Sequence, residues 1–106
     1  MTMDEVVSLH RRAMASADEA ILARRRRDRS SELAAMRQAF EYEKAAAEAA
    51  DRLGVDEPSR SVLLRSAASL AYDVGELGEA ERLAYVAMAG YPPEFVKSEL
   101  RGLLEN

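Results

Sequence analysis

The sequence contains no cysteine and no tryptophan, and its only histidine is His10. Without cysteine the chain forms no disulfide and has no thiol chemistry. A zinc site lacks its usual ligands, because no second histidine accompanies His10 and no Glu-x-x-His pair occurs. The five glycines lie where turns or helix ends are expected, and none belongs to a phosphate-binding loop. We therefore expect no metal, no cofactor and no catalytic residue, and we predict that the protein is not an enzyme.

Long apolar segments are also absent. No charge-free apolar run approaches the roughly 18 residues that a membrane-spanning helix needs. The first residues, MTMDEVVSLHRR, carry acids early and lack the apolar centre of an export signal. These features predict a cytoplasmic protein without a membrane partner.

The residues that are abundant favour helix throughout. Apolar residues make up 48% of the 106 positions, which indicates a folded chain rather than a disordered one. Alanine is frequent, β-branched residues are few, and no long segment alternates with the period of a strand. The length predicts a single helical domain over residues 1–106.

Turn signals divide this domain into two helical hairpins and a terminal helix. The DRSS sequence at 28–31 separates the first two helices, and Ser30 is the predicted N-cap of the second. The prolines and glycines then mark further helix ends. The predicted segments are a long first hairpin over 4–53, a shorter hairpin over 57–90 and a capping helix over 92–105. Spacing by three and four residues places Ile21 and Leu33 on inward-facing stripes.

Residues 75–92 read GELGEAERLAYVAMAGYP and form the most informative motif. Gly75 closes one helix, three alanines mark one side of the next, and Pro92 ends the unit. Residues 61–94 span about 34 residues, the length of one tetratricopeptide (TPR) repeat. The chain resembles a TPR protein here, and a second segment at 27–43 resembles the same turn and helix, with Glu32 at a site where a small residue is expected.

This resemblance implies an all-α fold, a right-handed TPR-like array of antiparallel helix pairs closed by the terminal helix. In TPR proteins the first helix of each pair lines a concave groove that binds peptides or helices. Carried over to this sequence, the groove implicates ten positions. They are Met14, Ala17, Ile21, Arg24, Arg25, Val62, Arg65, Ser69, Tyr72 and Asp73.

The resulting functional prediction is a non-catalytic interaction module that binds a peptide, a helix or an identical subunit. Two alternatives remain open at this level. The apolar groove positions can be exposed for a partner, or the longer first hairpin can bury them as core. A homodimer and a different protein partner both fit the pattern.

The cluster Arg24–Arg29 gives the alternative function. Residues 1–29 hold seven arginines against five acids, whereas residues 30–106 hold eight bases against fourteen acids. Arginine forks bind phosphate or carboxylate groups, so the cluster suits nucleic acid or a phosphorylated or acidic partner. The acidic overall charge of −4 and the absence of neighbouring aromatic residues make nucleic acid the weaker choice.

Overall fold

The computed structural model describes residues 1–105, and within that range the chain forms five α-helices and no β-strand. The all-α prediction and the number of helices are therefore confirmed, and each helix end lies within about two residues of the predicted end. The helices are α1 (Met3–Arg25), α2 (Arg29–Leu53), α3 (Ser59–Asp73), α4 (Leu77–Met88) and α5 (Glu94–Glu105).

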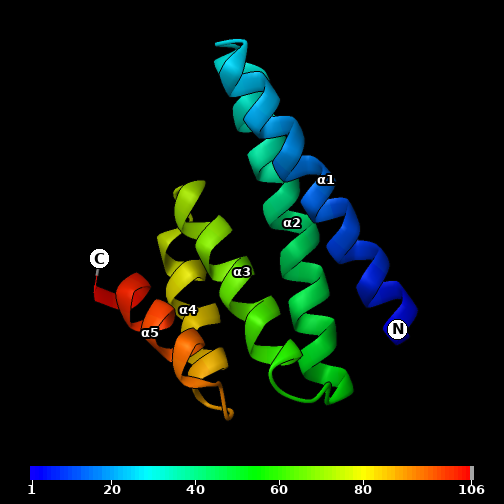
Figure 1. Ribbon diagram of the computed structural model, residues 1–106, viewed down its shortest axis with the longest axis vertical. Helices are drawn as coiled ribbons and strands as arrows, with labels where there is room; N and C mark the ends of the chain where they lie inside the picture. Colours follow the sequence, from blue (N-terminus) through cyan, green and yellow to red (C-terminus); the bar gives the residue numbers. More distant parts are fainter. Residues whose placement is uncertain (106) are drawn as a thin grey trace.

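The helices follow one another across the molecule, with α1 at one edge and α5 at the other (Figure 1). Over the described residues α1 packs against α2 alone, whereas α3 packs against α2, α4 and α5. The first hairpin is longer than the rest, since α1 and α2 contain 23 and 25 residues and α3 contains 15. Its tip, defined here as residues 20–33, therefore projects beyond the other helices in Figure 1.

Small side chains bring α1 and α2 together. Ala13 and Ala20 of α1 and Ala39 and Ala46 of α2 recur seven residues apart, and all four are almost fully buried. A seven-residue period keeps one stripe of each helix facing its neighbour along the whole hairpin. Because alanine projects so little beyond the backbone, the two helices can approach closely.

The turn between α1 and α2 differs from the prediction in its cap. Asp28, rather than Ser30, is the N-cap of α2, and its carboxylate accepts a hydrogen bond from the N–H of Ser31 at 3.2 Å. A carboxylate suits this position because it meets both a free backbone N–H and the positive end of the helix dipole. Arg27, just before it, adopts a left-handed backbone conformation with φ of 60°.

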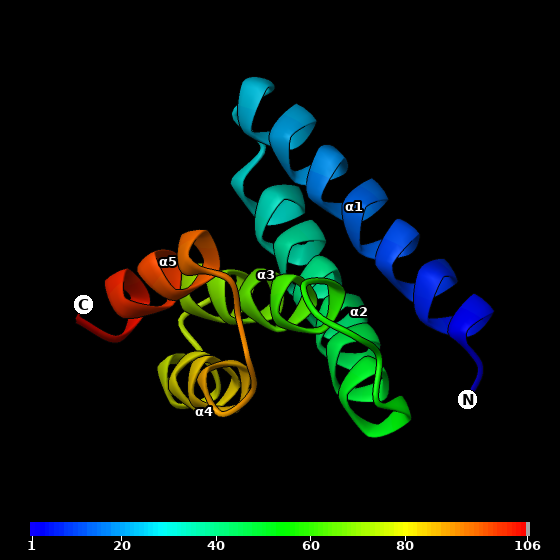
Figure 2. The ribbon, with the colours of Figure 1, turned by 60° about the horizontal axis from the view of Figure 1, so that its bottom comes forward.

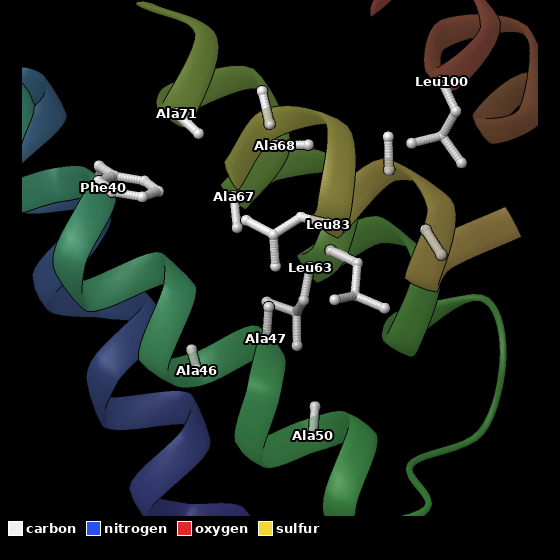
Figure 3. Close-up of a cluster of buried hydrophobic side chains, with 14 of the residues drawn as sticks. Phe40, Ala46, Ala47, Ala50, Leu63, Ala67, Ala68, Ala71, Leu83 and Leu100 are labelled. Carbon is white, nitrogen blue, oxygen red and sulfur yellow. The ribbon is translucent and has the colours of Figure 1, made fainter. Parts of the chain in front are cut away.

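The main core lies where α2, α3, α4 and α5 meet. Phe40 of α2 points toward the alanine face of α3, and Leu83 of α4 approaches the same face from the other side (Figure 3). Leu100 of α5 closes the far end of this core and is fully buried. Because these side chains of α3 are small, α2, α4 and α5 can all pack closely against it.

A polar network joins the two loops at the other end of this core. The Glu57 carboxylate accepts hydrogen bonds from the backbone N–H of Ser61 at 2.9 Å and from the N–H of Tyr91 at 3.0 Å. Arg60 donates to Asp51 at 2.7 Å and to the carbonyl of Val86 at 2.8 Å. The loop before α3 is thereby attached to the ends of α2 and α4.

Glu57 gives this network a defined pH dependence. Burial alone would raise the pKa of its carboxyl, but the hydrogen bonds from Ser61 and Tyr91 and the nearby charge of Arg60 lower the pKa below the ordinary value of 4.5. A lowered pKa in the folded state means that the unfolded chain binds the proton more tightly. The contribution of Glu57 to stability is therefore present above pH 4.5 and is lost as the pH falls through the folded-state pKa.

We expect Glu57→Gln to unfold at a lower temperature than the wild type at neutral pH and to lose less further stability on acidification. Thermal melts followed by circular dichroism between about pH 7 and pH 3 measure both effects. Glu81→Gln is the matched control, because Glu81 is exposed and forms no ion pair within residues 1–105. Parallel stability curves for the wild type and Glu57→Gln would contradict the assignment.

Candidate functional site

The candidate site is a groove between α1, α3 and α5. A depression of about 240 Å³ lies there, and it is lined by Met14 from α1, by Glu99 from α5 and by four residues of α3. The α3 residues are Arg65, Ser66, Ser69 and Leu70. Three helices that are distant in the sequence thus contribute to one surface, and each is the first helix of a pair or the terminal helix. We call this surface the α1–α3–α5 groove.

The charged groups of the groove are one cation and one anion. Arg65 forms an ion pair with Glu99 through its Nη1 atom. Its Nε atom is buried and has no hydrogen-bond partner among the described residues. An unsatisfied buried donor costs about 1–3 kcal/mol, so Arg65 would gain from a ligand that accepts a further hydrogen bond. The adjacent Ser66 and Ser69 hydroxyls can serve as either donor or acceptor.

The predicted groove residues are placed together only in part. Met14, Arg65 and Ser69 line the same depression, whereas Val62 is half-buried and packs against the core. Tyr72 lies elsewhere, in a separate depression of about 200 Å³ between α3, α4 and α5. Of the predicted α3 positions, Arg65 and Ser69 therefore lie in this depression, whereas Val62 and Tyr72, nearer the two ends of the helix, do not.

The remaining predicted positions lie toward the hairpin tip. Ala17 is half-buried, and Ile21 is 47% exposed. Asp73 of α3 is partly shielded from water, and this raises the pKa of its carboxyl. Arg24 lies close enough for its positive charge to oppose that rise. Arg24 and Asp73 thus mark the end of the groove nearest the tip. Met14 and Ile21 are exposed, which excludes the alternative in which the first hairpin buries these two residues as core.

Two of the clustered arginines at the tip have a structural role. Arg24 donates to Glu32 at 2.7 Å, and Arg29 donates to the same carboxylate at 3.2 Å. Hydrogen bonds from Arg24, against the opposing effect of burial, lower the pKa of Glu32. Glu32 is 4% exposed and occupies the seam position where the repeat pattern predicts a small residue. Two arginines therefore solvate a buried anion.

His10 also has a structural role. Its Nδ1 atom lies 2.8 Å from Oε1 of Glu43, which is completely buried between α1 and α2. The interaction joins the two helices of the first hairpin near its open end. No group of three or more potential metal ligands gathers within residues 1–105.

The groove residues that were not predicted from the sequence are Ser66, Leu70 and Glu99. The helical pattern of α5 placed Glu99 on its outward face, and that face adjoins the groove because α5 packs against α3. A single sequence shows which residues share a helix face, but it does not show which neighbouring helix that face meets. The ion pair between Arg65 and Glu99 crosses 34 positions and leaves no local signal.

Comparison of the chain with protein-family models, with curated proteins and with solved structures finds no match. Within residues 1–105 no helix combines the length and the apolar character needed to cross a bilayer.

Proposed function

We propose that the protein is a non-catalytic interaction module of TPR-like architecture whose α1–α3–α5 groove binds a peptide or a helix from another protein. The observation that carries this proposal is the meeting of Met14, Arg65 and Ser69 in one depression. The resemblance to TPR repeats implicates these three residues independently of their spatial arrangement.

The groove combines the features that a helical or extended peptide needs. Met14 offers a flexible apolar contact that adapts to different side chains. Arg65 can exchange its pairing with Glu99 for a carboxylate of the ligand. A ligand with an apolar residue beside an acidic residue fits both requirements.

Selection of binding peptides from a random library, followed by calorimetry, tests this function. We expect the selected peptides to bind the wild type and to lose at least about tenfold in affinity to Met14→Glu, because the substitution places a buried like charge against their acidic residue. Leu77→Glu is the matched control, since Leu77 is 60% exposed and lies on α4 outside the groove. Equal loss in both variants, or no loss in Met14→Glu, would refute the groove as the binding site.

An acidic or phosphorylated partner at the hairpin tip is the second candidate function. Arg25, Arg26 and Arg27 are exposed and form no ion pair within the described chain, and the tip projects from the other helices (Figure 1). Binding through these side chains would weaken steeply with salt, whereas binding through the apolar part of the groove would not.

A further inference from the structure

The outer face of α1, which points away from α2, carries a charge pattern that the fold does not use. Asp4, Arg11, Asp18 and Arg25 follow one another at seven-residue intervals, so they form one column along the helix. All four are exposed, and none forms an ion pair within residues 1–105. The charges alternate in sign along the column.

Two columns of uncharged residues flank these charges. Val7, Met14 and Ile21 repeat at seven residues on one side, and Met14 and Ile21 are 36% and 47% exposed. Ser8, Ala15 and Leu22 repeat at seven residues on the other side, where Leu22 is 50% exposed. The face therefore combines a central column of charges with flanking columns of uncharged side chains, all in the same seven-residue register.

We propose that this face binds the same face of a second copy of the chain, with the two α1 helices antiparallel. A two-fold axis between Met14 and Ala15 sets Asp4 opposite Arg25 and Arg11 opposite Asp18, so every charge meets the opposite sign. The same axis sets each residue of one uncharged column opposite a residue of the other column. The pairs are Val7 with Leu22, Met14 with Ala15, and Ile21 with Ser8.

The sizes of these side chains are complementary as well. Met14 meets alanine and Ile21 meets serine, so a large side chain always has a small or medium partner. In the antiparallel pair Leu22 of the second copy lies over Val7, next to Ser8 and Arg11 on the N-terminal half of the face.

Charge also disfavours the two nearest alternative arrangements of two α1 helices. A parallel pair would set each charge opposite its own copy, for example Asp18 opposite Asp18. An antiparallel pair shifted by one heptad would set Asp4 opposite Asp18 and Arg11 opposite Arg11. Like charges facing each other are destabilising, so the column favours one orientation and one register.

The fold leaves this face open. In Figures 1 and 2 α1 forms an edge of the molecule, on the opposite side of α2 from α4 and α5. Packing against α2 alone occupies one side of α1, so a second copy can approach the opposite side. The dimer face and the α1–α3–α5 groove share Met14, but Asp4, Arg11 and Asp18 do not line the groove, so the charge column can be tested separately from the proposed function.

Charge reversal tests the pairing through sedimentation equilibrium at low salt. We expect the wild type to dimerise and Asp18→Arg or Arg11→Asp to raise the dimer Kd by roughly tenfold to thirtyfold, since each reversal turns two attractive pairs into repulsive ones. The double variant Arg11→Asp/Asp18→Arg should recover wild-type affinity to within about threefold. Mixing the two single variants should give a heterodimer, because their charges are complementary.

Glu81→Arg on α4 is the matched control and should leave the Kd unchanged, since Glu81 is exposed on another helix. Circular dichroism confirms that each variant is folded. A wild type that stays monomeric at millimolar concentration would overturn the proposal. The proposal would also be overturned if the single charge reversals left the dimer Kd unchanged, or if the double variant failed to restore the wild-type Kd.

Discussion

Phe40→Ala is expected to lower the free energy of unfolding by about 3–5 kcal/mol. Phe40 is 2% exposed and points from α2 toward α3 (Figure 3). Its removal deletes a large apolar contact and leaves a cavity, and the alanines on the facing side are too small to fill it. The substitution acts on the junction between the long hairpin and the other three helices, because α2 is the only helix of that hairpin that packs against α3 within residues 1–105.

The chain supplies its own control for this experiment, because Phe95 is its only other phenylalanine. Phe95 is 58% exposed on α5, so Phe95→Ala should change stability by less than about 0.5 kcal/mol. Urea titration followed by circular dichroism measures both variants. Equal destabilisation by the two substitutions would show that Phe40 does not anchor the junction.

The second large effect is expected at the buried carboxylate of the first hairpin. His10→Ala should cost about 1–3 kcal/mol, because it leaves the completely buried Glu43 without its hydrogen-bond partner. The His10 side chain is itself 40% exposed, so its removal lets water approach Glu43 and keeps the cost below that of a sealed site. The same urea titration measures this loss.

A double variant separates the polar cost from lost packing. Glu43→Met replaces the carboxylate with an apolar side chain of similar length, so no buried anion remains when His10 is also replaced. We expect His10→Ala/Glu43→Met to be more stable than His10→Ala alone. If the double variant is the less stable of the two, the destabilisation comes from lost packing and not from an unpaired carboxylate.

The sequence predicted the helices and the unequal lengths of the two hairpins. Local signals were sufficient for this, because Gly54 takes the left-handed conformation expected of a helix C-cap and the prolines precede α3 and α5. The excess length of the first hairpin followed from the spacing between the two repeat-like segments. These features depend on residues close together in the chain.

Ile21 and Leu33 belong to the predicted apolar stripes, but they are 47% and 44% exposed. Both lie at the projecting tip, where α3, α4 and α5 are too short to cover the hairpin. Glu32 and Glu43 are buried instead, and each carboxylate has a cationic or histidine partner from α1 or the turn. Helical periodicity does not contain this tertiary information.

The candidate site could be predicted from the sequence only in part. The TPR resemblance placed Met14, Arg65 and Ser69 on one surface, and these three residues line one depression. Glu99 could not be assigned to it, because its contact with Arg65 depends on how α5 crosses α3. Tyr72 was assigned to the same surface, and it lines a separate depression with residues of α4 and α5.

Chemical-shift mapping with a selected peptide tests the central claim most directly. Amide spectra of the labelled protein, recorded with increasing peptide, identify the residues whose surroundings change on binding. We expect the largest changes at Met14, Ser66 and Ser69, with little change at Glu81 on α4. Changes concentrated at Arg25–Arg27, or on α4 away from α3, would contradict an interaction function of the α1–α3–α5 groove.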